Sequence, residues 1–600
     1  MSTKIPGTTI GGLVLGSLGL SITLYKTTLE AYSVFTTATS LGQDVSFLHA
    51  ELLIQQERLK RWGDGLGLSG ETNEPDERLN SETSLFQAVV AALASIRLIL
   101  TDLDDLTTVY GVGVKDETTS QRPLIKELAA TTKLMDSEAL LRNYNRRLED
   151  AKGLQKRLSI MKKLHWVIRN KEKFEGLIQK LTQFNDGLYS LLSPLDAQLL
   201  AEALAVQLLR TTNLERLIAL KAAAQRSHVD IASLAELRYR ASGLSQQAFK
   251  SPNMEKRHSC VSLTTRPTTS FQRRSTGTYT DEQDGEMQGI ATLIEWKVVE
   301  SGLPGEMAAA VERNTNDLAY FLQAKSRSPG LRSLTCIGFI RMPVETAEHV
   351  RYGLLYKAPP PPEPRAPVAS PTSLYDLLPQ REDEAVSDEF DLGDKFRVAQ
   401  ILAQSVYELH VSNWLHKAIC SDNVLFWPRK GGRVTPTSAC LSGYEFTRPG
   451  RLRDNTQPAG DVASSVYAHP LYRDGRVKYH RLFDIYSLGV TLLEIGLWAR
   501  AGEAVTKETS VYAVQDQLIE SCESELGPAM GAEYRTAVKL CLRGDFQVEG
   551  LHMTDRPEPS WDNFDPREIA RLEAADDQIN ADLTTEFYMH VVKPLKKLYA

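Results

Sequence analysis

Apolar residues recur at three- and four-residue spacing from residue 27 to residue 248, with few prolines between them. This period is that of an amphipathic helix, in which such positions share one face. One stripe is formed by Leu48, Leu52, Leu59 and Trp62, and a second by Val89, Leu93, Ile96 and Leu100. Strand-like alternation does not interrupt the pattern. The sequence therefore predicts an all-α helical bundle over residues 1–245.

Runs typical of strands appear only in the second half of the chain. Residues 290–299, 336–340 and 352–356 are apolar segments of strand length, and residues 307–325 have helical spacing between the first two of them. Helical stripes return further on and continue to the end of the sequence. We therefore expect a multidomain chain whose second domain, residues 289–600, mixes a sheet with helices.

Two polar segments break these patterns. Residues 246–288 are rich in Ser and Thr and contain few apolar residues, which predicts a disordered linker. Within it, Ser275 and Thr276 follow two arginines and are candidate phosphorylation sites. Residues 358–394 combine a Pro-rich run and an acidic run around a short helical stretch, and we interpret them as an insert that divides the second domain.

Composition and charge exclude several classes of function. A chain of 600 residues exceeds the roughly 250 to 300 residues that one core can serve, so at least two domains are expected. A net charge of -7 gives no reason to expect a nucleic-acid partner. The six cysteines are scattered, without a C-x-x-C pair or a histidine at zinc-ligand spacing. We expect a cytoplasmic, reducing environment, no bound metal and no disulfide framework.

The apolar run near the start spans residues 10–24. It lacks the basic flank and cleavage site of a signal peptide and is shorter than the roughly 20 residues of a transmembrane helix. Gly12 and Gly16 stand at G-x-x-x-G spacing, which permits close helix packing in lipid and in a soluble bundle alike. A buried helix and a membrane-inserting helix therefore both remain open. The candidate insertion helix comprises Ile10, Gly12, Leu13, Leu15, Gly16, Leu18, Leu20 and Leu24.

Positive charge gathers between residues 146 and 173, where ten lysines and arginines occur. One interpretation is a solvated helix face with spaced charges. The other is a surface that attracts anionic membranes.

Several short motifs of the first 240 residues stand in an order that resembles the HeLo domain of fungal heterokaryon-incompatibility proteins. After the Gly-rich apolar start these are Asp44, Leu52, Glu57-Arg58-Leu59, Trp62-Gly63 and Gly67-Leu68, followed by residues 165–174, HWVIRNKEKF. The last motif is similar to the family's tryptophan helix, with Asn170 where the family usually has Asp. The resemblance implies an all-helical bundle whose apolar N-terminal helix inserts into membranes during a cell-death response.

Residues 289–600 resemble a protein kinase by the order of their landmarks. Lys297 lies near the end of a predicted strand, where a kinase keeps the lysine that pairs with the ATP phosphates. Residues 416–423, HKAICSDN, have the place and length of the H-R-D-L-x-x-x-N catalytic loop, from which His416 and Asn423 survive. Asp484 stands where kinases keep a buried aspartate that binds the backbone of that loop.

The residues that carry phosphoryl transfer are missing from this kinase-like pattern. Ala418 replaces the catalytic-base Asp, and Ser442 replaces the metal-binding Asp of D-F-G. The resemblance therefore implies a bilobal kinase-like fold with no catalytic residue. Lys297 and Asn423 remain as candidate nucleotide-binding residues, and any ATP binding would be weak; alternatively, Lys297 is an edge-strand lysine and Asn423 caps a turn.

We expect an effector of fungal cell death or incompatibility that acts on membranes through its N-terminal helix and is regulated by an inactive kinase-like domain. The partners expected are anionic membrane lipids on activation, further copies of the chain and an unidentified upstream receptor, with relocation to the plasma membrane. Two alternatives remain. One is a divergent active kinase in which Asp422 or Glu445 takes over the lost roles, and the other is a non-catalytic scaffold.

Overall fold

A computed structural model describes most of the chain and divides it into two compact units. Unit 1 comprises residues 1–211 and 215–232, and unit 2 comprises residues 212–214 and 233–600. The described residues are 17–37, 46–69, 76, 78–115, 121–131, 133–142, 147–264, 273–280, 289–300, 305–323, 330–343, 349–359, 369–379, 390–428, 434–449, 466–473, 479–501, 510–551 and 566–598.

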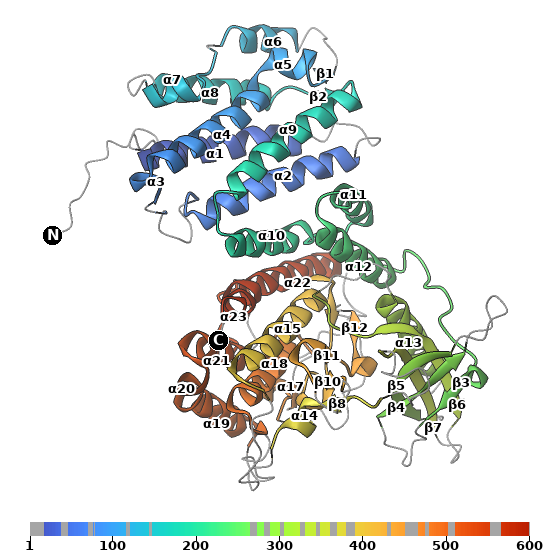
Figure 1. The fold of residues 1–600 in the computed structure, drawn as a ribbon. Helices are drawn as coiled ribbons and strands as arrows, with labels where there is room; N and C mark the ends of the chain where they lie inside the picture. Colours follow the sequence, from blue (N-terminus) through green and yellow to red (C-terminus); the bar gives the residue numbers. More distant parts are fainter. Residues whose placement is uncertain are drawn as a thin grey trace. The chain divides into compact units, whose positions relative to one another are not determined.

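Unit 1 is a bundle of helices, as the apolar spacing predicts (Figure 1). Its longer helices are α1 (Ser17–Thr36), α2 (Ser46–Gly65), α4 (Thr83–Thr101), α8 (Arg147–Met161), α9 (Lys171–Tyr189), α10 (Pro194–Leu208) and α11 (Leu214–Ala224). The shorter ones are α3 (Arg78–Ser81), α5 (Leu103–Thr108), α6 (Arg122–Ala129) and α7 (Ser137–Arg142). One antiparallel pair, β1 (Val112–Val114) with β2 (Trp166–Ile168), is an exception to the predicted all-α pattern.

The core of unit 1 forms where α1 packs against α2 and α4. The ring of Phe35 lies 5.1 Å from that of Trp166, and Tyr25 covers Gly63, where any Cβ atom would overlap its ring. Burial of such large aromatic side chains contributes much of a core's stability. Asn170 caps α9 by accepting a hydrogen bond from the Lys173 N–H at 2.9 Å.

Unit 2 begins with a sheet half, defined here as the described residues from 251 to 357. Its antiparallel sheet has the strand order β3-β4-β5-β7-β6. The elements are β3 (Val261–Leu263), β4 (Arg274–Thr280), β5 (Gly289–Glu300), α13 (Gly305–Leu322), β6 (Thr335–Pro343) and β7 (His349–Lys357). The predicted strands and the helix between them are therefore confirmed, while β3 and β4 were not predicted.

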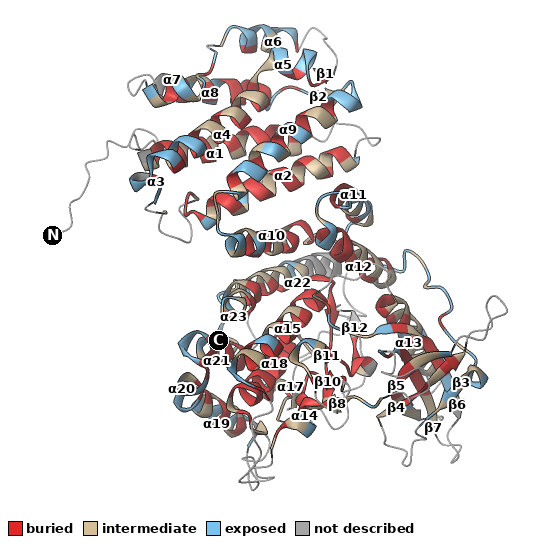
Figure 2. Cartoon of the chain, in the orientation of Figure 1, coloured by how far each residue is buried: buried red, intermediate tan, exposed pale blue. Residues whose placement is uncertain are grey.

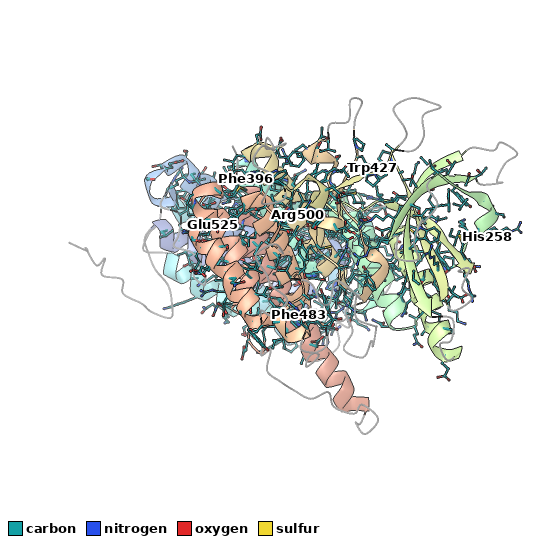
Figure 3. The ribbon with its side chains drawn as sticks, turned by 90° about the horizontal axis from the view of Figure 1, so that it is seen from below. His258, Phe396, Trp427, Phe483, Arg500 and Glu525 are labelled. Carbon is teal, nitrogen blue, oxygen red and sulfur yellow. The ribbon has the colours of Figure 1, made fainter. Side chains whose placement is uncertain are left out.

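The helical half of unit 2 comprises the described residues from 369 to 598. Helix α18 (Arg481–Leu497) is its centre and is buried along nearly its whole length (Figure 2). The helices around it are α14 (Leu374–Leu377), α15 (Leu392–Val411), α17 (Pro470–Arg473), α19 (Val511–Ser524), α20 (Leu526–Met530), α21 (Ala532–Arg543), α22 (Pro566–Phe587) and α23 (Lys593–Lys596). Phe396 of α15 and Phe483 of α18 both belong to the buried interior (Figure 3).

Short strands complete the helical half. Strands β8 (Thr372–Ser373), β10 (Val424–Phe426) and β11 (Cys440–Leu441) form one small sheet, and β9 (Trp414–Leu415) pairs with β12 (Arg448–Pro449). Because β8 and α14 lie within residues 358–394, this part of the predicted insert belongs to the folded half. Residues 360–368 and 380–389, which hold the Pro-rich and acidic runs, lie outside the described residues.

The predicted linker is wrong for part of residues 246–288. Strand β4 pairs with β3 on one side and with β5 on the other, so its backbone hydrogen bonds are made within the sheet. The predicted boundary at residue 245 also differs from the structure, because helix α12 (Val229–Ser245) belongs to unit 2 from Ser233 onward. Residues 265–272 and 281–288 of the predicted linker lie outside the described residues.

Candidate functional site

Asp484 of α18 holds the loop at residues 416–418 in place through hydrogen bonds. The carboxylate of Asp484 accepts hydrogen bonds from the backbone N–H groups of His416 and Lys417, both at 2.8 Å, and from the Tyr479 hydroxyl at 2.7 Å. Lys417 has a φ of 70°, a left-handed conformation that is costly for residues other than glycine. Two charge-assisted hydrogen bonds compensate for this conformation. Asp484 thus fixes the loop, which is the structural role expected of it.

Electrostatics within this buried loop keep its histidine neutral. Burial lowers the pKa of His416 to about 4. Burial alone would raise the pKa of Asp484, but the hydrogen bonds that it accepts from His410 and Tyr479 outweigh this effect and leave that pKa below its ordinary value. Burial also raises the pKa of Cys420 to about 12, so its thiol is protonated and is not a nucleophile at neutral pH.

Asn423 and the loop after β11 form the next layer of the site. The side-chain amide of Asn423 donates to the carbonyl oxygen of Ala418 at 2.6 Å, and the backbone carbonyl oxygen of Asn423 accepts from the Ser442 N–H at 2.9 Å. Gly443 has a φ of 85°, and a Cβ atom there would overlap the Asn423 side chain. Glycine is therefore required at this position both for its conformation and for space. Asn423 thus contacts both Ala418 and Ser442.

A partly buried arginine and a buried glutamate from the sheet half contact this site. Arg274 of β4 donates to the carbonyl oxygen of Asp422 at 2.9 Å and to the side chain of Asn423. Glu295 of β5 accepts from the Gly443 N–H at 2.7 Å and from the Ser442 hydroxyl. The guanidinium Nε of Arg274 lies 3.5 Å from Oε1 of Glu295. Both side chains thus join the sheet half to the helical half.

Sequence reasoning missed Glu295 and selected Lys297 instead. The side chain that β5 sends to Ser442 and Gly443 is that of Glu295, two positions earlier on the same face of the strand. Glu295 is 2% exposed, whereas Lys297 is only partly buried. The available signal was a charged residue inside an apolar strand, because a buried charge needs a partner. Its partners, however, lie 147 and 148 residues further along the chain.

The candidate phosphorylation sites are buried in β4. Ser275 and Thr276 are each 3% exposed, and the Ser275 hydroxyl accepts a hydrogen bond from the Trp296 indole at 2.9 Å. A kinase needs its substrate segment extended and accessible, which a strand paired on both sides is not. Phosphorylation of Ser275 or Thr276 would require β4 to leave the sheet, and it stays a prediction.

A second buried network of hydrogen bonds lies within the helical half and joins Tyr467 to Ser421 and Glu494. The Tyr467 hydroxyl donates to Glu494 at 2.8 Å and lies 2.7 Å from the Ser421 hydroxyl. The Ala501 N–H also donates to Glu494, at 3.0 Å. Burial raises the pKa of Glu494 to about 7, although these donors and Arg500 oppose the shift. Glu494 is therefore a buried carboxyl group that titrates near neutral pH, which the sequence did not indicate.

The chemistry open to this site is limited by its side chains. Ala418 offers no base, and Ser442 offers a hydroxyl that is already bonded to Glu295. Among the described residues, no group of three or more His, Cys, Asp or Glu side chains is placed to hold a metal ion. Phosphoryl transfer requires a base or water-positioning group and a metal against the phosphates. The described side chains of this site are joined to one another by hydrogen bonds.

The candidate insertion helix is only partly within the described residues. Ile10, Gly12, Leu13, Leu15 and Gly16 lie outside them. Leu18 is half-buried at the start of α1, and Leu20 and Leu24 belong to the core of unit 1. Among the described helices, α4 (Thr83–Thr101) is the one whose length and apolar composition would let it cross a membrane.

Some basic residues of the stretch at 146–173 make structural contacts within unit 1. Arg157 is buried and donates to the Thr101 carbonyl oxygen at 2.7 Å. Lys162 pairs with Glu30 of α1 at 2.6 Å. Exposed basic residues of the stretch include Lys152, Lys156, Lys162, Lys163, Lys171 and Lys173. Most of its described basic side chains therefore lie at the surface.

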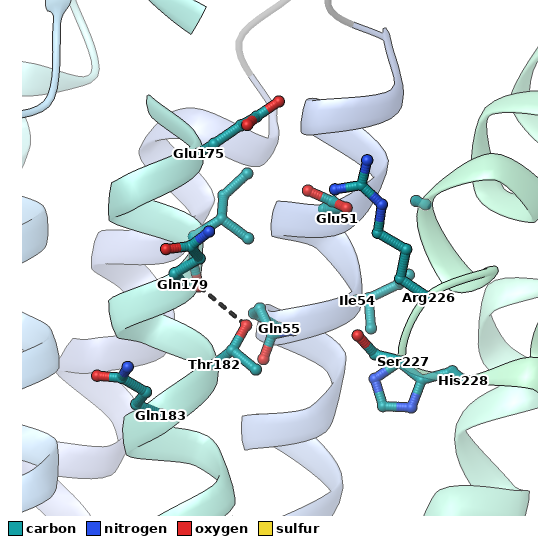
Figure 4. Close-up of a pocket in the computed structure, with 12 residues that line it drawn as sticks. Glu51, Ile54, Gln55, Glu175, Gln179, Thr182, Gln183, Arg226, Ser227 and His228 are labelled. Atoms are coloured by element: carbon teal, nitrogen blue, oxygen red, sulfur yellow. Dashed lines mark hydrogen bonds between the residues drawn. The ribbon is translucent and has the colours of Figure 1, made fainter. Parts of the chain in front are cut away.

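Unit 1 also contains a polar groove of about 350 Å³ between α2, α9 and the turn before α12 (Figure 4). Ile54 and Ile178 contribute apolar surface, and Arg226 points toward Glu51. Burial raises the pKa of Glu51, while Arg226 opposes that shift. Burial lowers the pKa of His228 to about 4. Sequence reasoning did not identify this groove, because its residues come from three separate helical segments.

The second half of α12 and the segment that follows it are bound to both halves of unit 2. Arg238 of α12 is buried and donates to the Val411 carbonyl oxygen at 3.1 Å in the helical half. Arg240 donates to the Tyr320 carbonyl oxygen at 3.1 Å, and its guanidinium lies 4.4 Å from the centre of the Tyr320 ring on α13. Farther on, the Phe339 N–H of β6 donates to the Met254 carbonyl oxygen at 3.1 Å. Residues 238–254 are thus a strap across unit 2.

Two family models match the chain. The HeLo model, described as prion-inhibition and propagation, matches residues 12–236, and a model described as a domain of unknown function (DUF7580) matches residues 349–570. No curated protein matches the chain. The first match agrees with the helical architecture of unit 1. It supports the identification of the N-terminal part of this chain as a HeLo domain.

Proposed function

We propose that the chain is a HeLo effector of the cell-death or incompatibility type, in which unit 2 is a catalytically inactive, kinase-like regulator of membrane action by unit 1. The HeLo match to residues 12–236 supports the effector class. The contacts that Arg274 and Glu295 make with the site of unit 2 are the observation that carries the regulatory role. These residues join the two halves of unit 2, and such an arrangement is suited to holding a conformation rather than to turnover.

The kinase-like assignment of unit 2 rests on the order of its elements. An antiparallel sheet with one helix between β5 and β6 precedes a helical half, and Asp484 binds the loop at residues 416–417 from a buried helix. The Ser442–Gly443 loop faces that loop through Asn423. These are the landmarks that the sequence resemblance named, in the same order.

Coupling between the regulator and the effector is supported by the strap. The HeLo match ends at residue 236, and Arg238 and Arg240 follow directly, bound to the helical and sheet halves of unit 2. A conformational change that moves the two halves apart would therefore act on the end of α12. Such a restraint needs only a few kcal/mol, on the order of what an interface within a chain provides.

Dye release from anionic and zwitterionic liposomes tests membrane action. We expect residues 1–245 to release dye from anionic vesicles and the full chain to release much less. In the shorter chain, Leu13→Glu with Leu15→Glu should abolish release, because each charge costs roughly 2.5 to 3.5 kcal/mol at the centre of an inserted helix. Thr8→Glu with Thr9→Glu, just before the apolar run, is the matched control and should retain release.

The outcomes separate the functions. Release that survives both leucine substitutions would refute insertion through residues 10–24. Equal release by the full chain would refute restraint by unit 2. No release from either protein would favour the scaffold alternative. The proposed ligands on activation remain anionic lipids, with self-association and relocation to the plasma membrane as further proposals.

A further inference from the structure

The carboxylate of Glu295 is held as a bound ligand would be. Its Oε1 accepts hydrogen bonds from the Gly443 N–H at 2.7 Å and from the Ser442 hydroxyl. Its Oε2 accepts from the Tyr444 N–H at 3.3 Å, and the side chain is 3% exposed. The Arg274 guanidinium lies beside it. One carboxylate therefore accepts three hydrogen bonds, two from backbone N–H groups and one from a hydroxyl, and lies 3.5 Å from the Arg274 guanidinium, with little access to water.

The donors are positioned by contacts that do not involve Glu295. Gly443 adopts a left-handed conformation, with φ 85° and ψ 39°, directly before a 3-10 turn at residues 444–446. Such a sequence of backbone conformations turns successive N–H groups toward one point and forms an anion-binding concavity. Asn423 packs against Gly443 and is itself held by the Ala418 carbonyl oxygen. The concavity is therefore expected to persist when the Glu295 side chain is shortened.

The local charge balance depends on Glu295. Arg274 has a second acidic neighbour, Asp422, at 3.4 Å, but the Asp422 side chain is 43% exposed and is shared with Arg273 at 3.9 Å. A half-exposed carboxylate neutralises a buried guanidinium less effectively than a buried one does. Loss of the Glu295 carboxylate would leave a mainly buried arginine and three further donors facing an unfilled space.

We propose that Arg274 and residues 442–444 form an anion-binding site whose resident ligand is the carboxylate of Glu295. Because Glu295 and Arg274 come from the sheet half and residues 442–444 from the helical half, this internal ligand latches the two halves together. A small monocarboxylate is the class of external ligand that fits, because its two oxygens can accept hydrogen bonds from the same donors. The latch lies within unit 2 and does not depend on membrane action. A negative dye-release result would leave the latch intact, and a negative result in the test below would leave the proposed membrane action intact.

Chemical rescue of Glu295→Ala tests the site in the full chain. Removing one partner of a buried charge pair should lower the Tm of the unit 2 transition by about 5 to 10 °C in calorimetry. Formate or acetate should restore most of that loss, at concentrations that leave the wild-type Tm unchanged. Sodium chloride at equal ionic strength should not, because a single chloride ion cannot place two acceptor atoms as a carboxylate does.

Two variants make the test specific. Glu295→Gln keeps the side-chain volume, so it should lose stability without rescue by formate. Glu312→Ala removes the carboxylate of a half-exposed pair with Arg341 at 3.7 Å and should show neither the loss nor the rescue. If Glu295→Ala does not fold, its refolding yield in formate and in chloride replaces the Tm measurement. Rescue equal in chloride and formate, or no loss in Glu295→Ala, would overturn the proposal.

Discussion

Oδ2 of Asp484 lies 2.8 Å from the backbone nitrogen of His416, which precedes it by 68 residues. Through this bond and its neighbour at Lys417, one buried carboxylate sets the path of the loop that bears Ala418 and Asn423. The path of this loop therefore depends on a residue that is distant in sequence and buried beneath it in the helical half.

Replacing Asp484 with alanine should destabilise unit 2 strongly. Two backbone N–H groups and the Tyr479 hydroxyl would lose their acceptor in a fully buried site. Hydrogen bonds to charged groups contribute about 1.5 to 3 kcal/mol each, so we expect a loss of about 3 kcal/mol or more in denaturant unfolding. Asp516→Ala, an exposed position on α19, is the control and should change little. Similar midpoints for both variants would contradict this role of Asp484.

The stability of unit 2 should depend on pH through Glu494. Its pKa is raised by burial to about 7 in the folded protein, against an ordinary value of 4.5, so the folded state binds the proton more tightly. This contribution is present below pH 4.5 and is lost as pH rises toward 7. In Glu494→Gln the free energy of unfolding should no longer fall as pH rises. Its stability relative to wild type should therefore increase by on the order of 3 kcal/mol between pH 4.5 and pH 8. Denaturant unfolding of both proteins across this pH range is the measurement. The same dependence of unfolding free energy on pH in both proteins would refute the raised pKa of Glu494.

The protein should not transfer phosphate from ATP. The site lacks a base at Ala418, and Ser442 is bonded to Glu295 rather than free to help bind a metal. An assay with radiolabelled ATP, magnesium and manganese should give only background incorporation, the same for wild type and Lys297→Met. Incorporation that Lys297→Met abolishes would establish the divergent-kinase alternative. Weak nucleotide binding without turnover would leave the proposed function intact.

Arg97 and Asp150 should form the most costly ion pair to break in unit 1 among its described pairs. They meet at 2.6 Å with both side chains 3% exposed, and Asp150 also accepts from the Met135 N–H at 2.7 Å. Arg97→Met leaves that carboxylate buried without its cation, a loss of about 3 to 5 kcal/mol. Adding Asp150→Leu should recover part of the loss, which a double-mutant cycle measures. The exposed pair of Arg142 with Glu138 is the control, where truncation should matter little.

Ser275 and Thr276 should resist phosphorylation in the folded protein. A basic-directed kinase should modify a peptide of residues 268–282 but not the native chain, because both hydroxyl groups lie in a strand paired on two sides. Mass spectrometry of both substrates after the same incubation provides the comparison. Stoichiometric phosphate on the native chain would show that β4 opens readily.

The sequence determined those features that depend on local periodicity. The apolar stripes of α2 and α4, the strand at β5 and the helix α13 are each visible within a few turns or a few residues, because burial of one face demands that spacing. The resemblance also located the loop at residues 416–423 and its support by Asp484. These features follow from residues that are neighbours in the chain or that keep a fixed order.

Only the tertiary structure decided the closed site. Strand β4 arises from a Ser- and Thr-rich segment with little alternation, since its stability comes from backbone hydrogen bonds to strands on both sides. Likewise, Glu295 rather than Lys297 faces Ser442, because strand register sets which residue points into the site. Arg274 meets Asp422 only when the two halves close, 148 residues apart in sequence. Such long-range pairings depend on the free energy of the whole fold, which no local pattern records.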